Sequence, residues 1–371
     1  MYKSNESEDI FEEKRNIMLW GWYGYENLGD DLLLDTMLKQ LYGDITVPIN
    51  KTYNLPGVKQ ISRNYKNLLM GAFHNDVLII GPGGLFPFDN KIKVIIYYII
   101  TMFWKLLNRK VIFFGIGISE RMSDFSVIMW RRMVKKADLF ITRSKKILKR
   151  IDVDESQTVH SAADCVFASD INQISNNIKS NRVIISVANL QQDNNRVFED
   201  VVKKWRDVII TLTEKEYEVD LIAFTKGRDD EMIAAITSSL NSTQMVNPIY
   251  YKDSFEAIHN WGQYKFAICM RFHSLVLSIL NNVPAVPIAY GQKTFSLAEM
   301  CNLSKYALVW NTYQSEYYGK SIDVSVEQIM EKVNQLCGDI DNVKIEMQSY
   351  KDELINSASN AFLQLMTVLY H

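Results

Sequence analysis

Apolar and polar positions follow two patterns along the first half of the chain. Short runs rich in Ile, Val, Leu and Phe are bounded by polar or small residues, which is typical of buried parallel strands. Such runs predict strands at 16–20, 44–50, 76–80, 110–115, 138–142 and 157–160. Between them, apolar residues recur every three or four positions and predict helices at 28–42, 92–108, 125–136 and 144–151. This strand–helix alternation predicts a doubly wound α/β domain.

The same alternation restarts after a polar stretch. Residues 172–181 hold seven Asn, Gln or Ser in ten positions, which is typical of a linker. Beyond it, the pattern predicts strands at 182–188, 219–225, 265–270 and 284–289, and helices at 197–217, 229–240, 254–261 and 274–281. We therefore expect two Rossmann-like doubly wound lobes facing a cleft, one over residues 1–175 and the other over 176–344. Residues 345–371 carry one apolar stripe, so they predict a helix that either packs back on the first lobe or ends the second.

Composition excludes several classes of protein. The chain has 371 residues, 41 Lys and Arg and 43 Asp and Glu, and this balance argues against a nucleic-acid partner. The four Cys residues lack metal-ligand spacing, which is typical of reduced thiols in a cytoplasmic protein. The N-terminus has no apolar core of a secretory signal. The longest apolar stretch, 94–107, is shorter than the roughly 20 residues that span a bilayer.

Positive charge gathers in one part of the sequence. Residues 91–150 contain fifteen Lys or Arg and three Asp or Glu, and they include the aromatic-rich stretch 95–104. A basic, aromatic face is typical of docking on the anionic inner surface of a cell membrane. A core helix beside solvated charged faces explains the same pattern. The docking hypothesis predicts that Lys105, Arg109 and Lys110 contribute to membrane binding.

Small and polar residues follow the predicted strands, where ligands bind open α/β sheets. Asn27 is placed to cap the first helix, followed by Gly29 and then by Asp30 in its first turn. Asp30 either stabilises the helix dipole or binds a sugar hydroxyl. Further along, Gly83 and Gly84 belong to a GPGG turn. This turn either lets backbone N–H groups approach an anion or is a tight turn needed for packing.

Cationic side chains follow three other predicted strands: Arg143, then Arg271 with His273, then Lys293 after Tyr290. An arginine fork suits a carboxylate or phosphate, and a histidine transfers protons near neutral pH. Residues two apart on an extended strand point to one side, so we expect Arg271 and His273 to face one ligand. A surface position in a basic cluster is the alternative for Arg143. No pair of histidines has the spacing of a metal site.

Seven ordered motifs resemble those of the polysaccharide pyruvyl transferase family: GWYGYENLGDD, GPGGLF, FFGIGI, ITRS, AADCVF, MRFHS and VPAVPIAYGQK. The resemblance implies a GT-B-like fold of two Rossmann-like lobes. It also implies transfer of a pyruvyl group from phosphoenolpyruvate, as co-substrate and with no cofactor. The acceptor would be two hydroxyls of a sugar in a capsule, exopolysaccharide or other cell-surface polysaccharide, or in its lipid-linked precursor.

The resemblance also assigns residues. The Arg-x-His pair of the family maps onto Arg271 and His273, its first-lobe arginine onto Arg143, and its NxGD turn onto Asn27, Gly29 and Asp30. The chemistry agrees, because phosphoenolpyruvate is a compact trianion that needs several cations, with Lys293 as a third. His273 is the best candidate for the acid, and Asp30 for a base or hydroxyl ligand. The same residues remain compatible with a GT-B glycosyltransferase that uses a nucleotide sugar, or with a non-catalytic component of a polysaccharide-assembly complex.

Overall fold

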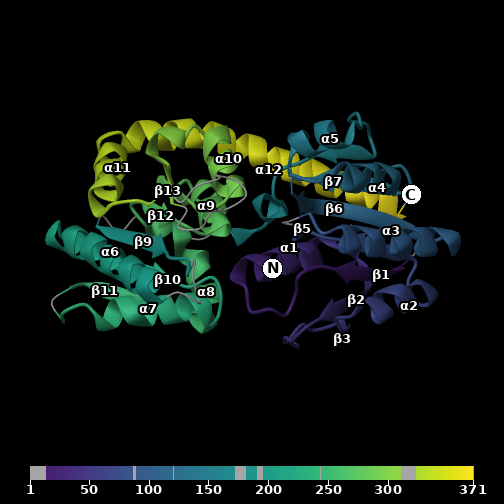
Figure 1. Cartoon of the computed structure of the whole chain (residues 1–371), viewed down its shortest axis with the longest axis horizontal. Coiled ribbons are helices and arrows are strands. Elements are labelled where there is room, and N and C mark those ends of the chain that lie inside the picture. The colour runs from purple at the N-terminus through teal and green to yellow at the C-terminus, as the bar shows by residue number, and fades with distance from the viewer. Residues whose placement is uncertain are drawn as a thin grey trace, which may run out of the picture. The chain divides into compact units, whose positions relative to one another are not determined.

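The apolar runs form two parallel sheets, one in each of two units of the chain (Figure 1). The computed structural model describes residues 14–86, 89–119, 121–171, 181–189, 195–242, 244–310 and 323–370. Unit 1 comprises residues 1–25, 30–168 and 354–371, and unit 2 comprises residues 26–29 and 169–353. The stretch predicted as the linker, 172–181, lies outside the described residues except for Asn181.

The sheet of unit 1 has the strand order β3-β2-β1-β4-β6-β7-β8, and β5 pairs with β6 off this path. Its strands are β1 (Arg15–Trp20), β2 (Gly43–Ile49), β3 (Lys59–Ser62), β4 (Val77–Ile80), β5 (Gly83–Phe86), β6 (Lys110–Ile118), β7 (Leu139–Thr142) and β8 (Val159–Ser161). Its helices are α1 (Leu28–Gln40), α2 (Tyr65–Met70), α3 (Lys91–Leu106), α4 (Asp124–Val134) and α5 (Lys145–Ile151), with short 3-10 turns at η2 (Gly71–Phe73) and η3 (Cys165–Ala168). The order reverses between β1 and β4, which places a switch point at their carboxyl ends.

Successive residues of β6 face opposite sides of the sheet. Phe113 lies in the hydrophobic core formed with α2, α3, α4 and α5. The next residue, Phe114, contacts Phe362 of α12 (Ile340–Tyr370), with 4.9 Å between ring centroids. The end of α12 is further held by Lys110, whose Nζ donates to the Val368 carbonyl at 2.6 Å. Residues 354–370 of α12 therefore cover the other face of this sheet.

The sheet of unit 2 repeats the topology with the order β11-β10-β9-β12-β13-β14, again fully parallel. Its strands are β9 (Arg182–Ser186), β10 (Glu218–Ile222), β11 (Val246–Ile249), β12 (Ala267–Cys269), β13 (Ala285–Ala289) and β14 (Leu308–Val309). Its helices are α6 (Asn195–Glu214), α7 (Arg228–Ser238), α8 (Tyr251–Ala257), α9 (Phe272–Leu280), α10 (Gln292–Met300) and α11 (Val326–Gly338), with 3-10 turns at η5 (Ile258–Gln263) and η6 (Ser304–Tyr306). The predicted pair of Rossmann-like α/β lobes is confirmed.

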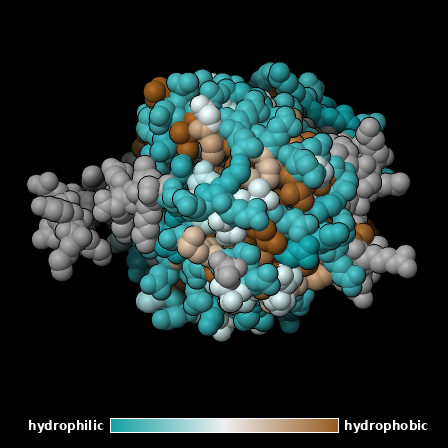
Figure 2. Space-filling view, turned by 90° about the vertical axis from the view of Figure 1, so that its left-hand side faces the viewer, coloured by the Kyte–Doolittle hydropathy of each residue, from teal (hydrophilic) through white to brown (hydrophobic). Residues whose placement is uncertain are grey.

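The side of unit 2 that carries α6, α7 and α11 is mostly polar. Figure 2 views the side on which α6, α7 and α11 lie in Figure 1, and it shows hydrophobic side chains scattered among hydrophilic ones. No helix in the described parts of either unit combines the length and apolarity needed to cross a membrane.

Candidate functional site

The first residues of α1 pack within unit 2. Asn27 caps the helix as predicted, because its Oδ1 accepts the Gly29 N–H at 3.0 Å. The Leu28 N–H donates to the Phe224 carbonyl at 2.7 Å, which fixes the start of the helix beside the end of β10. The Asn27 oxygen is thus committed to this cap.

Gly29 makes room for His273. A Cβ built on Gly29 would lie 2.1 Å from His273 Nδ1, far inside van der Waals contact. The imidazole therefore packs directly on the backbone of the first turn of α1. This close approach explains a glycine at position 29, where neither a turn nor a positive φ requires one.

We expect Gly29→Ala to displace the His273 ring and to reduce turnover by at least about tenfold, since misplacing a reacting group by about 1 Å costs up to about 10²-fold. Steady-state kinetics of the purified variant measure this. Gly338→Ala at the end of α11 is the matched control, because nothing described lies within 4 Å of a Cβ at that position. Equal turnover of the Gly29→Ala variant and the wild type would contradict the role given to this contact.

Arg271 is held by a buried carboxylate. Its Nε donates to Asp229 Oδ2 at 3.0 Å, and its Nη2 donates to the other oxygen of the same group. Asp229 is fully buried and also accepts the N–H groups of Phe224 and Thr225, each at 3.0 Å. A guanidinium gripped along one edge keeps a fixed orientation, and its remaining N–H groups can serve a ligand.

Tyr290 and Lys293 join Arg271 in unit 2. Arg271 Nη1 donates to the Tyr290 hydroxyl at 3.3 Å, and Lys293 Nζ lies 5.2 Å from the centroid of the Phe272 ring. Burial lowers the pKa of Arg271, because it disfavours the charged guanidinium. The electrostatic attraction of Tyr290 and Asp229 is larger, so the pKa of Arg271 is raised. Burial alone would raise the pKa of Tyr290, yet Arg271 and Lys293 lower it. At the Tyr290 hydroxyl, the two cations therefore outweigh the carboxylate of Asp229.

The prediction of an extended Arg-x-His segment is wrong. Strand β12 ends at Cys269, and α9 begins at Phe272, so Arg271 is its N-cap residue and His273 lies in its first turn. The Ser274 hydroxyl donates to the Arg271 carbonyl at 2.6 Å and helps to start the helix early. The side chain of Arg271 reaches Asp229 and Tyr290, whereas His273 packs on Gly29.

Arg143 in unit 1 has a similar arrangement. It follows the carboxyl end of β7, and its Nη1 lies 2.8 Å from Oδ2 of Asp164. The two side chains are 15% and 2% exposed, so the alternative of a surface position for Arg143 is wrong. Its Nε and Nη2 are buried and have no hydrogen-bond partner among the described residues. Such donors are available for an anionic ligand.

The GPGG segment is only partly a turn. A Cβ on Gly81 would lie 2.2 Å from the Phe114 carbonyl oxygen, so the packing interpretation holds there. Gly83 and Gly84 instead begin strand β5, which pairs with β6. Gly83 has a φ of +124°, and a Cβ on it would lie 3.5 Å from Asp30 Oδ1. Asp30 thus lies against β5 within unit 1. Gly84, the residue after Gly83, is exposed to solvent.

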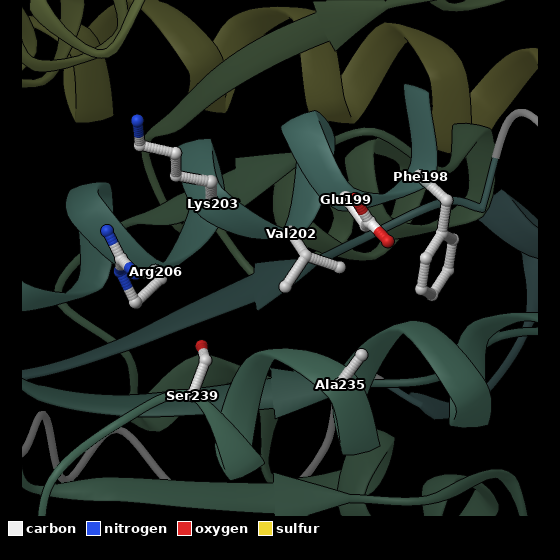
Figure 3. Close-up of a pocket in the computed structure, with 7 residues that line it drawn as sticks. All are labelled: Phe198, Glu199, Val202, Lys203, Arg206, Ala235 and Ser239. Atoms are coloured by element: carbon white, nitrogen blue, oxygen red, sulfur yellow. The ribbon is translucent and has the colours of Figure 1, made fainter. Parts of the chain in front are cut away.

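One cavity in unit 2 is lined by no predicted site residue. It has a volume of about 250 Å³ and lies between α6 and α7. Figure 3 shows its lining side chains: Phe198, Glu199, Val202, Lys203, Arg206, Ala235 and Ser239. Of its two cations, Arg206 is already paired with Asp207 at 2.6 Å. The residues around Arg271 are therefore the better candidate site of this unit.

Comparison with solved structures supports a GT-B-like fold. Staphylococcus aureus MnaA in complex with UDP has a TM-score of 0.58 at 11% identity and covers 95% of both chains. Glycyrrhiza uralensis UGT73P12 with glycyrrhetinic acid 3-O-monoglucuronide has a TM-score of 0.56 at 7% identity over 96% of both. Neisseria meningitidis UDP-GlcNAc 2-epimerase bound to UDP-GlcNAc has a TM-score of 0.54 at 10% identity, over 95% of this chain and 98% of that one. The GT-B-like expectation is confirmed.

Sequence comparison identifies the family. A comparison with curated proteins gives no match. The family model of the polysaccharide pyruvyl transferases matches residues 27–292, from the cap of α1 to the first residue of α10. This range covers most of the chain and includes Asp30, Arg143, Arg271 and His273. The chain belongs to the polysaccharide pyruvyl transferase family.

Proposed function

We propose that this protein transfers the pyruvyl group of phosphoenolpyruvate onto two hydroxyls of a sugar, which belongs to a cell-surface polysaccharide or to its lipid-linked precursor. The observation that carries the proposal is the buried Asp229–Arg271 pair inside a chain of this family. A guanidinium fixed in this way at a strand–helix junction suits the carboxylate or phosphate of a small anionic donor.

The donor requires several positive groups. Phosphoenolpyruvate carries a carboxylate and a phosphate, and Arg271 with Lys293 supplies two cations in unit 2. Tyr290, which touches Arg271, is available as a further hydrogen-bonding group. In unit 1, Arg143 offers two buried donors for an anion. Each arginine is oriented by its own buried carboxylate, so little rearrangement is needed when a ligand binds.

The reaction needs one proton donor and one proton acceptor. His273 protonates the methylene carbon of phosphoenolpyruvate while the first sugar oxygen bonds to C2 and loses its proton to Asp30. The bond between C2 and the ester oxygen of the phosphate then breaks. The second sugar oxygen bonds to C2, and its proton passes to the departing phosphate. Two hydroxyls and one phosphoenolpyruvate thus yield one ketal and one inorganic phosphate. Positioned acids and bases contribute roughly 10²–10⁴-fold to such steps.

A nucleotide-sugar transferase is the second candidate. The observation that favours it is the structural likeness to proteins solved with UDP and UDP-GlcNAc. A diphosphate would also suit the cations of unit 2. Thermal unfolding distinguishes the two, because a ligand that binds only the native state raises the melting temperature.

We expect phosphoenolpyruvate, and neither UDP-GlcNAc nor UDP, to raise the melting temperature of the protein. We further expect phosphate release when phosphoenolpyruvate is supplied with an acceptor from a panel of lipid-linked and nitrophenyl glycosides. Protection by UDP-GlcNAc alone would favour the glycosyltransferase. Protection by phosphoenolpyruvate without turnover of any acceptor would favour a non-catalytic role.

A further inference from the structure

Helix α3 is apolar on two opposite sides. One side carries Val94, Tyr97, Ile100 and Trp104, which are buried in the core of unit 1. The aromatic residues of the stretch 95–104 that lie on this side are therefore core residues. The other side exposes Ile92, Ile99 and Leu106, with 71%, 56% and 81% of each residue accessible to solvent. A surface helix usually carries polar residues on that side, so this apolar stripe needs an explanation.

The stripe continues onto both neighbouring elements. Phe73 of η2 is exposed and contacts the ring of Phe103 at a centroid distance of 5.9 Å. On the other flank, α4 packs beside α3 in the same core and exposes Ile128. We call this exposed apolar surface of unit 1 the α3 face. It consists of Phe73, Ile92, Ile95, Ile99, Leu106 and Ile128.

Cations border the α3 face. The exposed side of α4 continues from Ile128 to Arg132, and exposed Lys135 and Lys136 follow the helix. Two of the three acids in the segment 91–150 are paired with cations: Asp138 with Lys105 at 2.9 Å, and Asp124 with Arg150 at 3.2 Å. Four other cations of the segment pair with acids outside it, namely Arg109, Arg131, Arg143 and Lys145. The remaining Lys and Arg still leave a positive excess in unit 1, and Arg132, Lys135 and Lys136 are its exposed members beside the α3 face.

We propose that the α3 face docks on the surface of an anionic bilayer. The isoleucine, leucine and phenylalanine side chains would enter the headgroup region, and Arg132, Lys135 and Lys136 would contact lipid phosphates. Interfacial binding of this kind needs apolar area and flanking positive charge together. A two-fold dimer through this face is disfavoured, because it would bring two like-charged borders together. The inference does not depend on which group the site transfers.

The structure favours Arg132, Lys135 and Lys136 for lipid contact over the three cations predicted from the sequence. Lys105, Arg109 and Lys110 are partly buried and make contacts within unit 1. They are therefore poor positions at which to test membrane binding. Lys105 pairs with Asp138, Arg109 pairs with Asp76 at 2.9 Å, and Lys110 donates to the end of α12. Replacing them would disturb the fold as well as any lipid contact. Lys135 and Lys136 lack this complication.

The test is co-sedimentation of the full chain with vesicles of phosphatidylcholine alone or mixed with phosphatidylglycerol, at physiological salt. We expect binding only to the anionic vesicles. Lys135→Glu with Lys136→Glu should weaken it by about 25-fold or more, because each cation at an anionic surface contributes about fivefold. Ile99→Ser with Leu106→Ser should weaken it at least about fivefold through lost apolar burial.

Matched variants keep the test specific. Ile345→Ser with Leu363→Ser removes two side chains of similar exposure, 73% and 66%, from α12, and should leave binding unchanged. Lys203→Glu with Lys252→Glu, on exposed positions of unit 2, is the charge control. Absent binding of the wild type, or equal losses in test and control variants, would overturn the proposal. Loss of a solution dimer in the Ile99→Ser variant, without vesicle binding by the wild type, would assign the face to a second copy instead. Turnover of a soluble acceptor is measured separately and reports on the proposed function.

Discussion

Replacing His273 with alanine is expected to reduce turnover by roughly 10²–10⁴-fold, the usual contribution of a positioned general acid. Phosphoenolpyruvate binding should change little, because the cations that attract the donor are Arg271 and Lys293. Single-turnover kinetics give the rate, and isothermal calorimetry gives the Kd of the donor. His74→Ala is the matched control, since His74 is exposed in unit 1 and lies outside the site.

The His273→Ala result separates three interpretations. A folded variant that turns over slowly and binds normally supports a proton donor. Near-normal turnover would place the acid elsewhere. A variant that fails to fold would show that His273 is mainly a packing residue against Gly29.

Asp229→Asn is expected to destabilise unit 2 by about 3–5 kcal/mol, because breaking a buried ion pair leaves the remaining charge uncompensated. The amide oxygen can still accept one set of backbone N–H groups, but it cannot grip Arg271 with two anionic oxygens. Donor affinity should fall as well, since the guanidinium loses its orientation. Chemical denaturation measures the stability, and calorimetry measures the affinity.

Two further variants control the Asp229→Asn experiment. Asp253→Asn removes a mostly exposed acid that lies 3.9 Å from Lys252, so stability should stay within about 1 kcal/mol of the wild type. Arg271→Lys keeps the charge and loses the fork, so it should mainly weaken donor binding. Wild-type stability and affinity in Asp229→Asn would contradict the positioning role.

The interior of the fold could be predicted from the sequence because buried parallel strands are nearly continuous apolar runs. Two edge strands were not predicted, since β3 (KQIS) and β11 (VNPI) mix polar residues and proline with few apolar ones, whereas the edge strand β8 was predicted at 157–160. Strand β5 begins with two glycines, which are read as a turn from the sequence alone. Helix α11 is different: Ser325 and Gln328 form a capping box before buried residues at helical spacing, so its signal was present and was missed.

The candidate site was predictable in position and less so in detail. The rule that ligands bind beyond the carboxyl ends of parallel strands located Arg143 and Arg271. It could not find Asp229, whose partner Arg271 lies 42 residues away, because an acid in the first turn of a helix is common for reasons of the dipole alone. The early start of α9 was also missed, since it depends on the Ser274 hydroxyl bond to the backbone.

The central claim is that phosphoenolpyruvate donates a pyruvyl group that becomes a ketal. The most direct measurement is mass spectrometry and proton NMR of the acceptor after reaction in D₂O, together with phosphate release. We predict one phosphate for each ketal formed and one deuterium in the ketal methyl group, because an exchangeable acid on the protein protonates the donor methylene. Gain of a hexose by the acceptor with release of a nucleoside diphosphate, or no change in the acceptor while phosphoenolpyruvate stays intact, would contradict the claim.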